Sequence, residues 1–410
     1  MRILVLQESD WIAKGPHQGH HLVERMQARG HKVRIVDFEI RWADRQSASP
    51  LAQRRVFPDV HKVIEAGKVT VIRPAFLRLP VLDYASLLLT HAVEIRRQFR
   101  QFEPDVIVGF GILNAFLGIL IARRHRVPFA HYVIDELYRL MPRRVLKGLS
   151  KLVEQADYHR ADLVFSINEG LRDYTIAMGA PRKRAVLLRA GVDLERYLSA
   201  NGSEVRQRYG FTTDDLVLFF MGWLYSFSGL TEVAEDIVTA PVGGTNVKLL
   251  VVGKGDLWEP LERISAADSS AHRLALVSWR PYAELPAYLA AADICLLPAH
   301  QVDLMQNIVP IKVYEYMAAR KPVIAARLPG LVREFGEGNG VVFIDDPHEA
   351  VSTARELAAS GAIDSLGRKA RSFVSGNDWS KVTDEFESRL NRLVRDARVA
   401  RGPSADRPHN

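Results

Sequence analysis

Residues 294–325 read ICLLPAHQVDLMQNIVPIKVYEYMAARKPVIA, and their pattern indicates one strand–helix–strand unit. A short apolar run at 294–297 precedes a polar loop, residues 311–319 have apolar side chains at helical spacing, and a second apolar run follows at 323–325. Pro310 stands where the first turn of a helix needs no backbone donor. Short strands alternating with helices predict a parallel sheet with right-handed crossovers.

The same alternation runs along the whole chain, in two series separated near residues 195–212. Strands buried on both faces read as short apolar runs, and helices fill the gaps. The expected strands are 2–6, 33–37, 69–73, 106–108, 131–134 and 163–167, then 216–221, 248–252, 274–277, 294–297, 323–325 and 340–343. We therefore predict an α/β protein with two Rossmann-like parallel-sheet domains, residues 1–198 and 205–376, then a helix at 379–396 and a disordered tail at 398–410.

The composition excludes several classes of protein. The chain has 410 residues, of which 48% are hydrophobic and 25% charged, as is ordinary for a globular protein. Its single cysteine, Cys295, excludes an intrachain disulfide and a metal site built from several cysteines. The first residues read as a strand and not as a secretory signal, so we expect a cytoplasmic protein.

The charge is unevenly distributed. Residues 1–200 contain 32 basic and 21 acidic side chains, a net charge of +11, whereas the remainder carries −4. This excess favours either an anionic partner for the first domain or simply a solvated basic face. No basic run is interleaved with aromatic residues, so a nucleic-acid partner is not expected.

One apolar segment must be weighed as a membrane span. Residues 106–122 read VIVGFGILNAFLGILIA, at the lower limit of length for a spanning helix. Gly109 and Gly111 divide the segment, and Asn114 lies inside it. We interpret it as a buried strand followed by a helix from Asn114.

The helix after Pro310 carries the strongest candidate site. The free backbone N–H groups of Ile311 and Lys312 would cap a diphosphate, and Lys312 adds a full charge. Glu315 lies one turn later, beside Lys312 on the helix surface, where a carboxylate can accept hydrogen bonds from ribose hydroxyls. The alternative is a surface Lys–Glu pair on an ordinary helix.

Several motifs in the right order resemble glycosyltransferase family 4, whose members are retaining enzymes of the GT-B fold. The resemblance covers roughly residues 1–395. The motifs are Arg29-Gly-His-Lys-Val33, Ala161-Asp-Leu-Val-Phe-Ser166, Gly191-Val-Asp193, Val252-Gly-Lys-Gly255, Ala292-Asp-Ile-Cys-Leu-Leu-Pro298, and Glu315-Tyr-Met-Ala with Lys321-Pro-Val-Ile.

The resemblance implies two domains facing a central cleft, with the C-terminal helix returning to the first domain. It implies a nucleoside diphosphate sugar as donor, most often UDP- or GDP-linked, and no metal or other cofactor. By the same resemblance, the catalytic candidates are Asp135, Lys312 and Asn307; the donor-binding candidates are Glu315, Pro310, Ile311, Gly222, Gly253, Trp279 and Arg280; and the candidates of the acceptor and phosphate loop are Gly15 and His17.

The sequence departs from the family pattern at three places. Asn307 stands where the family has the first Glu of a pair, and an amide can still donate and accept hydrogen bonds. In Gly222-Trp-Leu-Tyr-Ser-Phe-Ser-Gly229 both diphosphate-binding cations of the family are missing, and Lys312 is a candidate to replace one. The segment 128–135 keeps only Asp135 of a frequent His-Asp pair.

Three patterns leave other interpretations open. Gly109-Phe-Gly111-Ile-Leu-Asn114 with Asp135 imitates a dinucleotide fingerprint that lacks its third glycine. His20 and Glu24 share a helix face at the spacing of metal ligands. Trp279 can stack on a nucleobase or be an ordinary core aromatic.

We therefore predict a retaining hexosyltransferase that acts without a metal. The alternatives are a non-catalytic sugar-nucleotide-binding module and a nicotinamide-dependent oxidoreductase. The acceptor is expected to be a glycan or a lipid-linked sugar, because a basic amphipathic helix suits an anionic membrane surface at the cytoplasmic leaflet. The basic residues of that helix are Arg139, Arg143, Arg144, Lys147 and Lys151.

Overall fold

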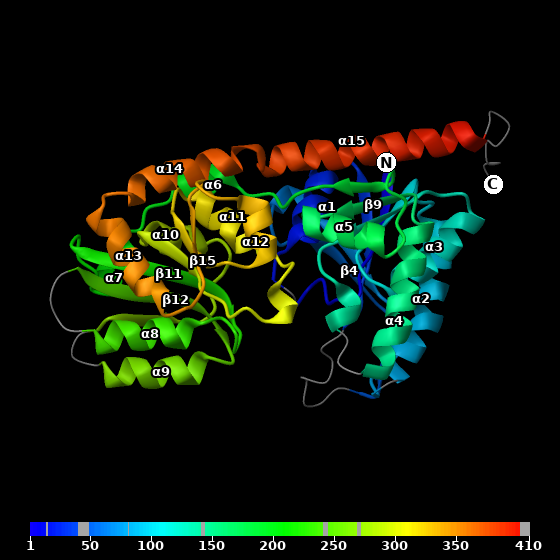
Figure 1. The fold of residues 1–410 in the computed structure, drawn as a ribbon. Helices are drawn as coiled ribbons and strands as arrows, with labels where there is room; N and C mark the ends of the chain where they lie inside the picture. Colours follow the sequence, from blue (N-terminus) through cyan, green and yellow to red (C-terminus); the bar gives the residue numbers. More distant parts are fainter. Residues whose placement is uncertain are drawn as a thin grey trace. The chain divides into compact units, whose positions relative to one another are not determined.

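The computed structural model describes residues 1–13, 15–39, 49–80, 82–140, 144–240, 245–268 and 272–401, without the side chains of residues 140, 144–146, 304 and 401. It is an α/β protein in which helices cover parallel sheets (Figure 1). The chain divides into two compact units, one formed by Met1–Arg189 with Trp379–Asn410 and the other by Ala190–Asp378. The predicted fold class is confirmed.

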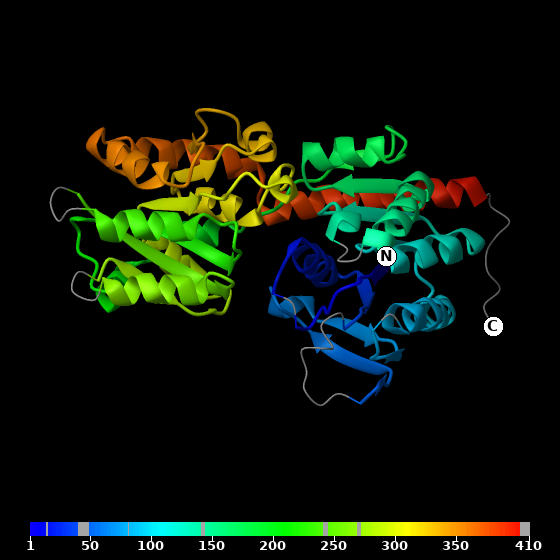
Figure 2. The same ribbon diagram turned by 60° about the horizontal axis from the view of Figure 1, so that its bottom comes forward.

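An eight-stranded sheet forms the centre of the first unit, in the order β10-β9-β8-β7-β1-β2-β5-β4. β4 pairs antiparallel with β5 and forms the outer edge, in blue in Figure 2, and the other strands pair in parallel. Two short strands, β3 (Leu51–Ala52) and β6 (Phe76–Leu77), make a separate antiparallel pair. The sheet consists of β1 (Arg2–Leu6), β2 (Lys32–Val36), β4 (Arg55–Val60), β5 (Val69–Arg73), β7 (Val106–Gly109), β8 (Phe129–Val133), β9 (Leu163–Ser166) and β10 (Ala185–Leu187).

Helices that follow the strands complete the first unit. They are α1 (Gln18–Ala28), α2 (Leu82–Gln101), α3 (Leu113–Arg124), α4 (Arg144–Arg160), α5 (Glu169–Ala177) and α15 (Trp379–Arg401). The C-terminal helix α15 packs on α1, where the His21 ring stacks on Trp379 with centroids 4.2 Å apart. The predicted return of this helix to the first unit is confirmed. It extends to Arg401, so residues 398–401 are helical although we expected disorder from 398; residues 402–410 lie outside the described part.

The second unit has a six-stranded parallel sheet in the order β13-β12-β11-β14-β15-β16. Its strands are β11 (Asp215–Leu224), β12 (Asn246–Gly255), β13 (Leu274–Val277), β14 (Ile294–Leu297), β15 (Val323–Ala326) and β16 (Val341–Ile344). Its helices are α6 (Leu194–Leu198), α7 (Ser203–Arg208), α8 (Leu230–Thr239), α9 (Trp258–Ala267), α10 (Leu285–Ala290), α11 (Ile311–Ala318), α12 (Pro329–Phe335), α13 (Glu349–Ala359) and α14 (Ile363–Phe373). In Figure 1, α8 and α9 cover one face of this sheet, and α10 and α11 the other.

The first unit ends at Arg189, before the expected boundary at residue 198. Helix α6 contacts α10 and α11 of the second unit, and Arg371 donates a hydrogen bond to the Leu194 carbonyl at 3.0 Å. Gly202, which lies in the expected separation at 195–212, is needed for close packing, because a Cβ there would lie 2.2 Å from the Ala291 nitrogen. Helix α6 and Gly202 therefore belong to the second unit, and the boundary lies earlier in the chain than we predicted.

The apolar segment 106–122 is divided as predicted. Its first part is the buried strand β7, and its second part is α3, which begins at Leu113. No helix in the described part of the chain combines the length and apolar character that crossing a membrane requires.

Candidate functional site

Two predicted donor-binding residues, Gly222 and Gly253, and the catalytic candidate Lys312 meet at the carboxyl edge of the second sheet. Gly222 on β11 lies opposite Gly253 on β12, and a Cβ at Gly253 would lie 1.9 Å from the Gly222 carbonyl oxygen. Gly222 has a φ of 126°, and a Cβ there would lie 2.9 Å from the Lys312 Nζ. The two glycines therefore let the backbone approach the Lys312 ammonium closely, at the edge of an α/β sheet where ligands bind.

Helix α11 begins beside this contact. Pro310 is its N-cap residue, and Ile311 is the first helical residue. A proline has no backbone N–H, so the first donors that the helix presents are those of Ile311 and Lys312. This N-terminus, with the Lys312 side chain, has the chemistry of an anion site.

The Lys312 side chain is held in a poorly solvated position. Its Nζ lies 4.0 Å from the centroid of the Phe220 ring. Burial lowers the pKa of Lys312 to about 7, although the charge of Glu315 opposes this shift. The residue is therefore close to half protonated near neutral pH.

Glu315 is buried, with 9% of its surface exposed, and is not on the helix surface as we expected. Its Oε1 accepts hydrogen bonds from Tyr197 at 2.7 Å and Tyr282 at 3.1 Å. Burial raises its pKa, against the hydrogen bonds of the two tyrosines and the charge of Lys312. A carboxylate has about four acceptor positions, so both hydroxyls can be bound while capacity for a ligand remains.

The two tyrosines were not predicted from the sequence. Tyr197 lies on α6 and Tyr282 precedes α10, far from Glu315 in the chain. No motif connects these three positions. Their association follows from the packing of α6 against α10 and α11.

Asn307 lies in the turn between β14 and α11. A Cβ at Gly330 would lie 3.1 Å from the Asn307 Cα, and Gly330 donates to the Gln306 carbonyl at 2.7 Å. The start of α12 therefore fixes the backbone on which Asn307 stands. The packing against Gly330 therefore places Asn307, with its side-chain amide, in the loop that leads to Pro310.

Trp279 and Arg280 follow β13 at the same edge of the sheet. Trp279 is 57% exposed, so it is not a core aromatic. The Arg280 Nε is buried and has no hydrogen-bond partner in the described part of the chain. An exposed indole next to an unsatisfied guanidinium donor suits a planar polar ligand such as a nucleobase.

Trp223 and Ser228 stand at the positions where the family's two diphosphate-binding cations are missing, and exposed aromatic side chains lie on the segment between them. Trp223 is 41% exposed and Tyr225 is 48% exposed. The Tyr225 ring stacks on Phe227 with centroids 4.9 Å apart. In this edge of the second unit, Lys312 is the basic side chain that the structure places against Gly222.

The remaining candidates lie in the first unit. His17 is the N-cap residue of α1, and its ring nitrogen accepts a hydrogen bond from the Gly19 N–H at 3.2 Å. Gly15 precedes it, and Asp135 follows β8. All three are at the carboxyl edge of the first sheet.

The spacing of His20 and Glu24 has a structural explanation. Both side chains are fully buried. Glu24 accepts hydrogen bonds from the backbone N–H groups of Lys62, Val63 and Ile64, and His20 Nε2 lies 2.9 Å from the Trp11 carbonyl oxygen. Among the described residues, no group of three histidine, cysteine or acidic side chains is placed to hold a metal ion.

The dinucleotide-like segment does not present a free helix N-terminus. The Glu8 carboxylate accepts a hydrogen bond from the Asn114 N–H at 2.6 Å, in the first turn of α3. A Cβ at Gly111 would lie 2.8 Å from the Glu8 Cδ. Because the protein's own carboxylate occupies the place of a pyrophosphate, this segment disfavours a nicotinamide cofactor.

Comparison with known proteins agrees with the two-unit architecture. A family model described as glycosyl transferase 4-like domain matches residues 17–191, and the model of glycosyl transferases group 1 matches residues 215–360. Each model falls on one of the two sheets.

Relatives are similar over most of their length. A D-inositol 3-phosphate glycosyltransferase of Geodermatophilus obscurus is 25% identical over 387 residues, covering 88% of this chain and 84% of the relative. The 2-deoxystreptamine glucosyltransferase of Streptomyces kanamyceticus is 23% identical over 318 residues, covering 73% of this chain and 77% of the relative.

Solved structures share the fold. Anabaena Alr3699/HepE in complex with UDP superposes with a TM-score of 0.72 at 16% identity, covering 96% of this chain and 100% of the other. The sucrose-phosphate synthase of Thermosynechococcus elongatus gives a TM-score of 0.72 at 15% identity, covering 97% of this chain and 100% of the other.

Proposed function

We propose, because this chain belongs to glycosyltransferase family 4 and has the GT-B fold, that it moves a sugar from a nucleoside diphosphate sugar to an acceptor hydroxyl with retention of configuration. Its activity as a glycosyltransferase follows from the family. The donor, the stereochemical course and the acceptor are the proposal.

The observation that carries the donor assignment is the contact of Lys312 with Gly222 at the start of α11. When the sugar–phosphate bond breaks, negative charge develops on the leaving diphosphate. Preorganised donors aimed at that charge are the strongest means of catalysis. Two backbone N–H groups and one ammonium at a glycine-lined edge meet this need without a metal ion.

A UDP-linked donor is the first choice. The solved structures of HepE contain UDP and UDP-glucose, and the chain shares their fold. In this proposal Trp279 and Arg280 hold the base, Glu315 binds the ribose hydroxyls, and Asn307 contacts the transferred sugar. Asp135 orients the sugar or acceptor, and the departing diphosphate takes the acceptor's proton, so no strong general base is required.

The acceptor is proposed to be a polyol or glycan hydroxyl, free or lipid-linked. The relatives named above are a D-inositol 3-phosphate glycosyltransferase and a 2-deoxystreptamine glucosyltransferase, so cyclitol acceptors belong in the first screen. Gly15 and His17, at the carboxyl edge of the first sheet, are proposed to lie against this acceptor.

The test is release of nucleoside diphosphate from UDP-, GDP-, ADP- and dTDP-sugars, each with D-inositol 3-phosphate, 2-deoxystreptamine and a lipid-linked glycan. We expect one donor to be used and to raise the melting temperature, because it binds only the folded chain. A donor that raises the melting temperature while no acceptor supports release would favour the non-catalytic binding module. Neither position of the missing cations carries a charge, since one is the exposed Trp223 and the other the buried Ser228, and this makes the second candidate worth testing.

The pKa of Lys312 predicts how donor binding depends on pH. The diphosphate attracts the ammonium form, which prevails below about pH 7 in the free protein. Above that pH, binding must take up a proton, so the affinity for UDP-glucose should fall about tenfold per pH unit. Titration calorimetry between pH 6 and 8.5, in buffers of different ionisation enthalpy, measures both affinity and proton uptake. A flat profile would contradict this role for Lys312.

The buried tyrosine hydroxyls around Glu315 predict an effect of mutation on donor binding. Tyr197→Phe removes the 2.7 Å hydrogen bond to the carboxylate while Tyr282 remains. A hydrogen bond to a charged group contributes about 1.5–3 kcal/mol, so UDP-glucose should bind about tenfold more weakly or worse. The matched control is Tyr314→Phe. Tyr314 lies on α11 beside Glu315, and the change removes a comparable buried hydrogen bond of 2.6 Å to a different carboxylate, that of Glu334. Equal losses in both variants would mean that Glu315 has no special role in binding.

Membrane association of the first unit is proposed through α4. Its Leu149 and Leu152 are 60% and 65% exposed, and Lys151 between them is also exposed. Arg139 pairs with Glu136 at 2.6 Å, which weakens its contribution. Arg143 lies outside the described residues, and the side chain of Arg144 is not described. Exposed leucines beside a lysine suit an interfacial helix.

We expect the chain to sediment with vesicles as their fraction of anionic lipid rises, and to be released by high salt. The double variant Leu149→Ser/Leu152→Ser should bind at least fivefold more weakly. Leu198→Ser, at a 52% exposed leucine of the second unit, is the control. Vesicle binding that does not depend on the fraction of anionic lipid would contradict this proposal.

A further inference from the structure

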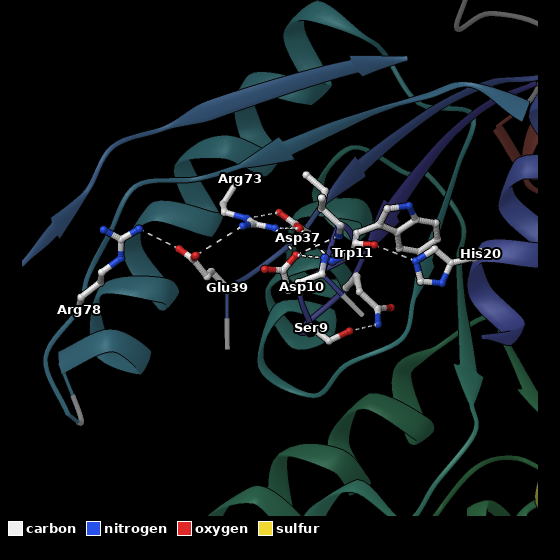
Figure 3. A network of polar contacts seen from close by, with 11 residues as sticks. Ser9, Asp10, Trp11, His20, Asp37, Glu39, Arg73 and Arg78 are labelled. Atoms are coloured by element: carbon white, nitrogen blue, oxygen red, sulfur yellow. Dashed lines mark hydrogen bonds and ion pairs between the residues drawn. The ribbon is translucent and has the colours of Figure 1, made fainter. Parts of the chain in front are cut away.

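A buried ion-pair network lies at the carboxyl ends of β1, β2 and β5 (Figure 3). Its centre is Arg73, which is 6% exposed. The guanidinium donates through Nε to Asp37 Oδ1 at 3.0 Å and through Nη2 to Asp10 Oδ1 at 2.7 Å. Asp10 follows β1 and Asp37 follows β2, so one side chain from β5 connects two neighbouring loops.

The two carboxylates in turn hold three consecutive backbone amides. Asp37 Oδ2 accepts from the Trp11 N–H at 3.1 Å. Asp10 Oδ1 accepts from the N–H groups of Ile12 at 2.9 Å and Ala13 at 2.8 Å. The loop formed by residues 9–13, here named the β1 loop, is thus fixed by carboxylates that Arg73 holds in place.

The β1 loop is linked to His17 through His20. The Trp11 carbonyl oxygen lies 2.9 Å from His20 Nε2, and the two rings have centroids 3.9 Å apart. His20 Nδ1 accepts from the His17 N–H at 3.3 Å. A continuous path of contacts therefore runs from Arg73 through the β1 loop to the N-cap of α1.

Stability alone is a poor reason for such a network. Buried ion pairs are often no more stabilising than apolar side chains of similar volume, and their best-supported benefit is a defined geometry. Burial acts to lower the pKa of Arg73, but its bonds to Asp37 and Asp10 more than offset this and keep it charged. A planar fork that bonds two carboxylates at once has no equivalent in lysine.

We propose that Arg73 is a positioning residue for sugar transfer: by fixing the β1 loop it orders the start of α1 and holds His17 against the acceptor. This inference rests on the proposed function for the acceptor role of His17. Arg73 itself touches neither substrate, so its loss acts on the acceptor side and leaves the donor site of the second unit intact.

The experiment compares four variants of the full chain. Arg73→Lys keeps the charge and loses the fork. Asp10→Ala removes the acceptor of two loop amides but keeps the Arg73–Asp37 pair. It tests the same loop if Arg73→Lys fails to fold. Asp10→Asn restores an acceptor oxygen. The control is Arg78→Lys, which disturbs the buried pair with Glu39 at the outer end of the same network, where Glu39 Oε1 lies 3.9 Å from Arg73 Nη1, and does not touch residues 11–13.

The first readout is hydrogen exchange of the amides of residues 11–13, which requires no substrate. We expect exchange to be at least tenfold faster in Arg73→Lys and Asp10→Ala, and near wild type in Asp10→Asn and Arg78→Lys. Unchanged exchange in Arg73→Lys and Asp10→Ala would overturn the proposal.

The second readout is transfer from UDP-glucose to the acceptor that the screen identifies. We expect Arg73→Lys and Asp10→Ala to raise the acceptor KM at least tenfold, with the donor KM within twofold of wild type. An acceptor KM that changes no more than in Arg78→Lys would also overturn the proposal. If the wild-type chain uses no donor and acceptor, the proposed function fails, whereas the exchange experiment still decides whether Arg73 fixes the loop.

Discussion

Lys312→Met is expected to reduce kcat for sugar transfer by about 10²-fold or more, which is the size of effect seen when one preorganised donor is removed from a developing oxyanion. The Nζ that this change removes lies next to Gly222, at the start of α11. Its charge matters most as the diphosphate departs, so kcat should fall more than the affinity for the donor. Initial rates at saturating and limiting UDP-glucose separate the two quantities.

The matched control for this prediction is Lys254→Met. Lys254 is an exposed lysine on β12, at the same edge of the sheet. It changes the net charge equally without touching Gly222, so its kcat should stay within twofold of wild type. Equal losses in both variants would show that general electrostatics, and not the position of Lys312, supports turnover. Full activity of Lys312→Met would show that the donor site is elsewhere.

The sequence predicts the fold well because its strands are short, apolar and buried on both faces. The strands 2–6, 69–73, 274–277 and 294–297 have the predicted bounds. β4 was missed because it lies at the edge of the sheet and is largely exposed, so its residues lack that apolar pattern.

Part of the candidate site was also predictable, because it depends on contacts that a parallel sheet repeats. Residues at the carboxyl ends of adjacent strands meet, so Gly222 and Gly253 could be paired from their motifs. The burial of Glu315 could not be foreseen, since Tyr197 and Tyr282 approach it from other elements. The Arg73 network could not be foreseen either, because its members lie at the ends of three different strands.

The basic excess of the first half shows how little charge counts say about position. Many exposed arginines lie in the last turn of a helix or just after it, including Arg100 on α2 and Arg123 and Arg124 on α3. A cation there interacts favourably with the helix carbonyl groups. These residues therefore have a structural explanation, and they lie at the edge of the sheet opposite to the candidate site residues.

Gly253→Ala is expected to destabilise the second unit by about 3 kcal/mol or more, which is at the upper end of the cost of overpacking. A Cβ at this position would lie 1.9 Å from the Gly222 carbonyl oxygen, which is backbone and cannot rotate away. β11 and β12 would have to separate, and Gly222 would move relative to Lys312. The thermal unfolding midpoint should therefore fall by about 6 °C or more.

The control for this variant is Gly376→Ala in the same unit, because a Cβ there meets nothing within 4 Å. Its stability should stay within about 0.5 kcal/mol of wild type. At a low temperature where the Gly253→Ala variant remains folded, it should bind UDP-glucose at least tenfold more weakly than wild type. The reason is that the displaced Gly222 backbone no longer leaves room for a phosphate beside Lys312. A Gly253→Ala chain with normal stability and normal donor affinity would contradict both the close contact of the two strands and its role in the donor site.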